Sequence, residues 1–137
     1  MSRTVVFRIL MAVYVAAVAF LCFGNFGSLP EAPGQLLGMP ADKVAHFLMF
    51  LPFTVILTFC FSNPGKTPVR AVLGVAGMFL AGCAVAAATE LVQGTLPYRT
   101  ADAKDFLADA LALAAGSVAT IIITACRHRR AAANDEQ

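Results

Sequence analysis

Four apolar stretches, each about as long as a helix that crosses a bilayer, take up most of this 137-residue chain. The mean hydropathy is +0.77, and 59% of the residues are hydrophobic while only 13% are charged, which is unusual for a soluble domain. The sequence therefore predicts an all-α integral membrane protein, a four-transmembrane-helix bundle. We expect the spans at about residues 9–26, 44–61, 71–92 and 106–126.

The two ends of the chain carry basic residues beside apolar stretches. Arg3 and Arg8 precede the first stretch as in a signal peptide, but that stretch is long and no A-x-A-like site follows it, so we expect a retained span. Residues 1–126 then form one membrane domain. Residues 127–137 form a tail that begins basic and is expected to be disordered.

The positions of lysine and arginine predict the orientation, because positively charged loops stay in the cytoplasm. Both termini are therefore expected on the cytoplasmic side of the membrane, in a multi-pass topology. The net charge of +2 gives no electrostatic support for nucleic-acid binding. Seven basic residues lie on the side of the termini (Arg3, Arg8, Lys66, Arg70, Arg127, Arg129 and Arg130) and three on the other side (Lys43, Arg99 and Lys104).

Proline, glycine and alanine predict how the spans pack. Pro52 lies inside span two and predicts a kink there, because proline removes one backbone hydrogen bond. Spans three and four are rich in glycine and alanine, which lets helix backbones approach closely in lipid. We therefore expect these two spans to pack together through small faces that include Gly82 and Gly116.

Polar residues gather at the outward ends of spans two, three and four. Charge in the bilayer interior costs on the order of 3 kcal/mol per residue, so such residues need a partner, water or a task. Helical spacing puts Glu90 with Gln93, and Asp105 with Asp109, on single faces. The pattern predicts one outward-facing polar binding site, formed by Lys43, His46, Glu90, Gln93, Arg99, Asp102, Asp105 and Asp109.

For some of these residues, anchoring of helix ends at the membrane surface is a simpler interpretation than a binding site. Asp42, Lys43, Asp102 and Lys104 can reach water, and anchoring of helix ends explains them equally well. His46, Glu90 and Asp109 lie about one turn inside apolar stretches and are stronger functional candidates. Acidic residues outnumber basic residues by five to three here before His46 is counted (Asp42, Glu90, Asp102, Asp105 and Asp109 against Lys43, Arg99 and Lys104).

Metal ligation has no support in the sequence spacing. The four cysteines stand singly in or beside the spans, no C-x-x-C pair occurs, and no second histidine lies at ligand spacing from His46. We therefore expect no metal and no cofactor.

The polar residues carry a family resemblance. The ordered series resembles the pattern of the VanZ-like proteins, a bacterial family of small multi-span membrane proteins, over residues 42–117. Two positions depart from the pattern, since Asp109 stands where the family usually has asparagine and Ala112 where it commonly has glycine. The resemblance implies a place in the bacterial cytoplasmic (inner) membrane and a link to glycopeptide (teicoplanin) resistance, with which the founding member is associated. The series is Asp42-Lys43, His46-Phe47, Glu90, Gln93, Arg99, Asp102, Asp105, Asp109 and Gly116.

Three functions compete at the sequence level. The first is binding of a lipid-linked envelope precursor or a lipoglycopeptide among the membrane lipids, with Lys43, Arg99 and Lys104 contacting its anionic head. The second is an intramembrane hydrolase or transferase that uses His46 and Glu90. The third is a small proton-coupled transporter that uses Glu90 and Asp109.

We favour the binding role over the other two. The set contains a single histidine and no serine or cysteine nucleophile, which counts against an enzyme, and four spans without an inverted repeat count against a carrier. Whether the protein is an enzyme stays open, with the balance against it. The sequence also leaves homo-oligomer formation open.

Overall fold

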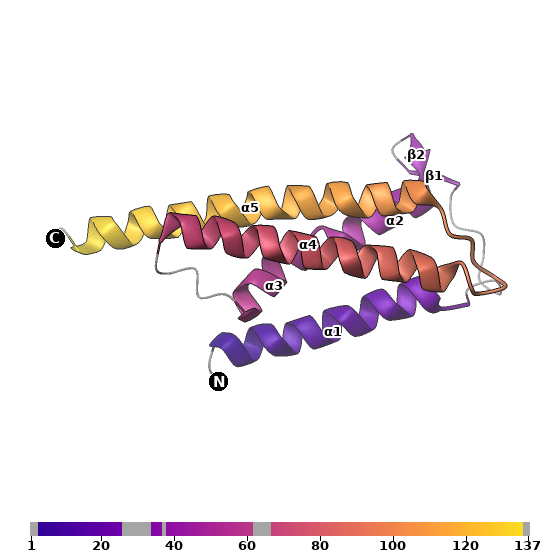
Figure 1. Cartoon of the computed structure of the whole chain (residues 1–137), viewed down its shortest axis with the longest axis horizontal. Coiled ribbons are helices and arrows are strands. Elements are labelled where there is room, and N and C mark those ends of the chain that lie inside the picture. Colours follow the sequence, from indigo (N-terminus) through magenta and orange to yellow (C-terminus); the bar gives the residue numbers. More distant parts are fainter. Residues whose placement is uncertain (1–2, 26–33, 37, 62–66, 136–137) are drawn as a thin grey trace.

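The computed structural model describes residues 3–25, 34–36, 38–61 and 67–135 of the chain. Long helices dominate this part of the chain and lie roughly side by side, with a short hairpin at one end (Figure 1). The hairpin pairs Gln35 with Pro40 and Leu36 with Met39. The elements are α1 (Arg3–Phe23), β1 (Gln35–Leu36), β2 (Met39–Pro40), α2 (Ala41–Phe50), α3 (Phe53–Phe61), α4 (Pro68–Gln93) and α5 (Ala103–Asp135).

Four helical segments are long and apolar enough to cross a membrane, which confirms the predicted all-α, four-span class. Each segment begins two to four residues before the predicted span. The extra residues include Asp42 and Lys43 at the start of span two, and Asp105 at the start of span four. Acidic groups suit the first turn of a helix, where its dipole is positive. The segments are Val5–Phe23, Ala41–Phe61, Val69–Gln93 and Ala103–Arg127.

Span two is broken at the predicted proline. Helix α2 ends at Phe50 and α3 begins at Phe53, so the break falls at Leu51 and Pro52. Proline has no backbone N–H to donate into the preceding turn, which explains why one continuous helix does not form. The break turns the carbonyl of Leu51 towards α5, where it lies next to Gly116.

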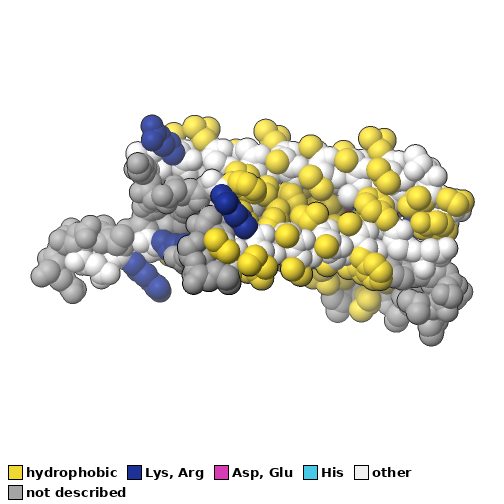
Figure 2. All heavy atoms as spheres, turned by 90° about the horizontal axis from the view of Figure 1, so that it is seen from below, with side chains coloured by type: hydrophobic (Ala, Val, Ile, Leu, Met, Phe, Trp, Pro, Cys, Tyr) yellow, Lys and Arg dark blue, Asp and Glu magenta, His cyan; other side chains and the backbone are white. Residues whose placement is uncertain are grey.

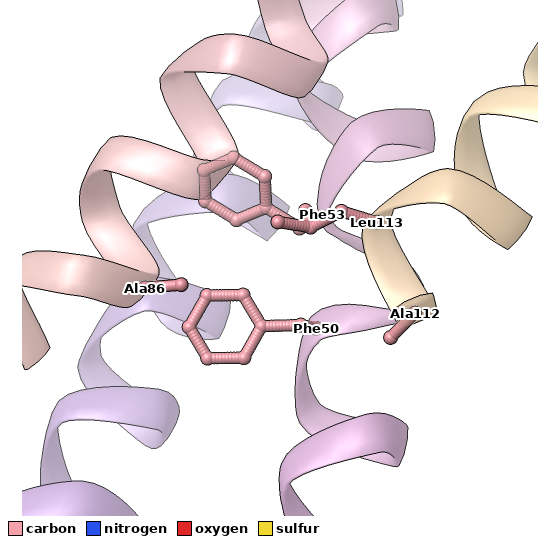
Figure 3. Close-up of a cluster of buried hydrophobic side chains, with 5 residues drawn as sticks. All are labelled: Phe50, Phe53, Ala86, Ala112 and Leu113. Carbon is pink, nitrogen blue, oxygen red and sulfur yellow. The ribbon is translucent and has the colours of Figure 1, made fainter. Parts of the chain in front are cut away.

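A small apolar core joins α2, α3, α4 and α5 near this break. The rings of Phe50 and Phe53 have centroids 6.2 Å apart and fill the space between the helices (Figure 3). Tyr14 of α1 packs against the same core, and its hydroxyl donates a hydrogen bond to the carbonyl of Met49. The buried members of the core are Phe50, Phe53, Ala86, Ala112 and Leu113.

Helices α4 and α5 pack together as predicted, but only one of the two glycines takes part. A Cβ atom on Gly82 of α4 would lie 2.6 Å from Cδ2 of Leu113 on α5. A Cβ atom on Gly116 would instead lie 2.5 Å from the carbonyl oxygen of Leu51. Gly116 therefore serves the contact between α5 and the break in span two, and its prediction as an α4–α5 contact was wrong.

Helix α5 extends beyond the membrane-spanning segment to Asp135, although the sequence analysis assigns residues 127–137 to a disordered tail. Ala131, Ala132 and Ala133 have the highest intrinsic helix propensity, and arginine is also a good helix former. The described part of the tail is therefore helical rather than disordered.

The outer surface of the bundle is apolar along its length. Large hydrophobic side chains are exposed on every long helix, among them Phe20, Leu73, Leu80 and Leu111. Figure 2 shows apolar side chains over one such face, while the lysine and arginine side chains visible in that view gather towards the end where α1 begins and α5 ends. This surface suits lipid chains, and polar residues that need a partner must face inward.

The start of α1 and the end of α5 lie at the same end of the bundle (Figure 1). We predict that this end is cytoplasmic, from the distribution of lysine and arginine. In a variant without the four native cysteines, a cysteine replacing the exposed Thr100 should react with a membrane-impermeant thiol reagent added to intact cells. A cysteine replacing the exposed Ala133 should react only after the cells are opened. The reverse labelling pattern would invert the orientation.

Candidate functional site

The outer part of the polar cluster is organised by Lys43, which lies in the first turn of α2. Its Nζ atom lies 2.6 Å from Asp105 Oδ1, 2.9 Å from Asp102 Oδ2 and 3.2 Å from Asp42 Oδ2. One ammonium group thus binds three carboxylates, two of which belong to the start of span four. These ion pairs fasten α2 to α5 at the end of the bundle opposite the termini.

Asp102 lies just before α5 and makes two contacts, a hydrogen bond at the start of the helix and an ion pair. Its Oδ1 atom accepts a hydrogen bond of 2.9 Å from the backbone N–H of Lys104, one of the N–H groups that a helix start leaves without a partner. Its Oδ2 atom contacts Lys43. The backbone N–H of Lys104 and the ammonium of Lys43 together hold the pKa of the Asp102 carboxyl below its usual range, so it is ionised at neutral pH.

The inner part of the cluster consists of His46, Glu90 and Asp109, one from each of α2, α4 and α5. His46 Nδ1 lies 3.1 Å from Asp109 Oδ1, a hydrogen-bond distance, and 3.9 Å from Glu90 Oε1. His46 lies one turn further along α2 than Lys43, and Asp109 one turn further along α5 than Asp105. The contact between Lys43 and Asp105 is therefore followed, one helical turn further along both helices, by the contact between His46 and Asp109.

Exposure falls from the outer part to the inner part of the cluster. The side chain of Asp42 is 57% exposed, that of Lys43 is 20% exposed, and that of Asp109 is fully buried. His46 and Glu90 are also buried, with side chains 9% and 10% exposed. The cluster is thus a path of polar groups that leads from the surface into the apolar bundle.

Two carboxylate oxygens in the inner part have no hydrogen-bond partner among the residues that the structure describes. Glu90 uses Oε2 to accept a hydrogen bond of 3.1 Å from the backbone N–H of Asp102, while its Oε1 atom is buried and unpartnered. Asp109 uses Oδ1 for His46, while its Oδ2 atom is likewise buried and unpartnered. Unpartnered charged oxygens are costly in an apolar interior, so these two atoms need an explanation.

Gln93 and Arg99, which we predicted in the same site, instead hold the end of α1. Gln93 Nε2 donates to the carbonyl of Cys22 over 3.0 Å, and Arg99 Nη2 donates to the carbonyls of Leu21 and Gly24 over 2.8 and 3.2 Å. Carbonyls at a helix C-terminus lack partners within the helix and attract cations. Arg99 thus binds the end of α1, and its predicted bridge between the carboxylates stays a prediction.

The structure also changes the roles of two residues that the sequence analysis assigned to anchoring. Asp42 contacts Lys43 and belongs to the outer part of the cluster. Lys104 is exposed, and only its backbone N–H makes a described contact with the cluster, through Asp102. The residues brought together are Lys43, His46, Glu90, Asp102, Asp105 and Asp109 of the predicted set, with Asp42 added.

Chemically, the cluster is acidic and suited to proton or cation binding. Five carboxyl groups face one lysine and one histidine within the cluster. A histidine that is hydrogen-bonded to a buried carboxylate is a common arrangement for a general base or a metal ligand. The fold and the cluster together define a multi-span membrane protein with a buried acidic site at one end of its helices.

Comparison with known proteins identifies the family. The family model described as VanZ/LLP1 matches residues 5–124, which is most of the chain. The protein therefore belongs to the VanZ-like family, as the order of polar residues indicated. Neither the curated proteins nor the solved structures that were compared with the chain gave a match.

Proposed function

We propose that this VanZ-like protein binds the polar head of a lipid-linked or lipidated envelope molecule at its acidic cluster. One observation supports the proposal most strongly. Charged groups from three spans converge at one end of the bundle and run from an exposed Asp42 to a fully buried Asp109. A sequence keeps such groups inside a membrane chiefly where they perform a task. An envelope role, including glycopeptide resistance of the teicoplanin type, is part of the proposal.

The charges of the cluster decide which kind of head fits. Lys43 binds three carboxylates and Arg99 donates to carbonyls of α1, so acidic groups rather than these cations dominate the cluster that we had expected to bind an anionic head. Carboxylates accept hydrogen bonds and attract cations. The cluster is therefore suited to a head rich in hydroxyl or ammonium groups, such as the sugar or peptide part of an envelope precursor or a lipoglycopeptide.

Native mass spectrometry of the detergent-purified protein tests this proposal. We expect a lipid-linked or lipidated envelope molecule to remain bound to the wild-type protein and to be lost from Asp105→Asn. The matched control is Arg70→Gln, which changes an exposed charge at the other end of α4 and should keep the bound molecule. If the wild-type protein retains only the phospholipids that Asp105→Asn also retains, the proposed binding role is wrong.

The hydrogen bond between His46 and Asp109 favours a second candidate, an intramembrane hydrolase or transferase. A buried carboxylate orients the imidazole, and the ring can then accept a proton from a nucleophile. In this case Glu90→Gln should abolish turnover of the bound molecule while its binding persists. A pure binding protein would release the molecule unchanged from both forms.

A further inference from the structure

We propose that His46, Glu90 and Asp109 bind a divalent first-row metal ion such as Zn²⁺ or Mn²⁺. This inference does not depend on the proposed binding of an envelope molecule. It also differs from the sequence-based expectation of no metal, which rested on spacing along the chain. The three residues come from three different helices, so their spacing in the sequence carries no signal of a shared site.

The distances between the donor atoms suit one shared ion. One donor atom from each of the three residues can be chosen so that all lie within 4.8 Å of one another. His46 Nδ1 is 3.1 Å from Asp109 Oδ1 and 3.9 Å from Glu90 Oε1. Two ligands of a tetrahedral zinc ion lie about 3.4 Å apart, as follows from metal–ligand distances of about 2.0–2.1 Å. The observed distances bracket that value, and small side-chain shifts would complete the geometry.

The unpartnered oxygens give an independent reason to place a cation there. Glu90 Oε1 and Asp109 Oδ2 are buried without a hydrogen-bond partner, and Oε1 of Glu90 is turned towards the imidazole of His46. A metal ion beside His46 Nδ1 and Glu90 Oε1 would give Oε1 the partner that the described residues do not supply.

The charge balance around these residues points in the same direction. If both carboxyl groups are ionised, one divalent ion neutralises their charge, whereas a protonated His46 neutralises only half of it. The nearest lysine, Lys43, is already bound to Asp42, Asp102 and Asp105. Mixed imidazole and carboxylate ligands are typical of zinc, manganese and iron sites.

The surroundings resemble the second shell of a metal site. The backbone N–H of Asp102 binds Glu90 Oε2, which fixes the carboxylate with Oε1 turned inward. Such outer contacts orient metal ligands and raise metal affinity. Three protein ligands also leave a coordination position for water or for an oxygen of a bound molecule, as in catalytic rather than structural sites.

Isothermal titration calorimetry on the EDTA-treated, detergent-purified protein tests the inference, with Zn²⁺ and Mn²⁺ as probes. We expect one ion per chain for the wild-type protein. Glu90→Gln and Asp109→Asn, which keep the side-chain shape, should each lower the affinity more than about tenfold. The control is Arg70→Gln, because Arg70 is an exposed residue at the start of α4, away from the cluster, and its replacement should leave the affinity unchanged.

Thermal unfolding of the wild-type protein provides a second readout that needs no variant. An ion that binds only the folded state stabilises it by RT ln(1 + c/Kd), where c is the free ion concentration, so the Tm rises with the logarithm of that concentration once it exceeds the Kd. The inference is overturned if neither metal binds or raises the Tm of the wild-type protein. It is equally overturned if Glu90→Gln and Asp109→Asn bind the ion as tightly as wild type, or if Arg70→Gln lowers the affinity as much as they do.

Discussion

Replacing Gly116 with alanine should destabilise the bundle by about 1–3 kcal/mol, the usual cost of forcing extra atoms into a packed site. A Cβ atom at this position would lie 2.5 Å from the carbonyl oxygen of Leu51. That oxygen belongs to the backbone at the Pro52 break, so it cannot rotate away as a side chain would. We expect a lower Tm in detergent, measured by circular dichroism, and a smaller resistance to denaturant.

Two other glycines provide matched controls for this substitution. Gly77 of α4 has open space where a Cβ atom would be placed, so Gly77→Ala should stabilise the protein by up to about 1 kcal/mol through helix propensity alone. Gly82 contacts the side chains of Leu113 and Phe53, which can adjust, so Gly82→Ala should lie between the two. A Gly116→Ala protein as stable as Gly77→Ala would show that the close approach of α5 to Leu51 does not exist.

Gly116 illustrates what a sequence can predict about packing. The run of small residues in spans three and four predicted that α4 and α5 would approach closely, and Gly82 confirms that contact. The contact partner of Gly116 was not predictable. A small residue indicates a close contact with another part of the chain, but it does not indicate which helix supplies that contact. The position of the Leu51 carbonyl depends on the break at Pro52.

The candidate site likewise combines contacts that the sequence predicts with contacts that it does not. Helical spacing predicted that Asp105 and Asp109 share a face and that His46 lies at the same end of the bundle, which the ion pairs confirm. The partners of Gln93 and Arg99 are backbone carbonyls of α1. Every residue has a carbonyl group, so such contacts leave no mark in the sequence.

Replacing His46 with leucine should also lower the stability of the protein strongly. His46→Leu leaves the carboxylate of Asp109 fully buried without its imidazole partner, 3.1 Å away in the wild-type protein. Breaking a buried ion pair by removing one partner typically costs about 3–5 kcal/mol, because the remaining charge must be neutralised or stay desolvated. We expect a correspondingly lower stability of the EDTA-treated protein in denaturant, where no bound metal contributes.

A second substitution separates this electrostatic cost from the loss of packing around the ring. In His46→Leu/Asp109→Asn the buried charge is gone, so the double variant should be more stable than His46→Leu alone, although the amide still lacks partners. Lys104→Leu removes an exposed charge at the same end of α5 and should change stability by less than about 0.5 kcal/mol. If the double variant were no more stable than His46→Leu, packing rather than charge would account for the loss, and the His46–Asp109 contact would not be an energetically coupled pair.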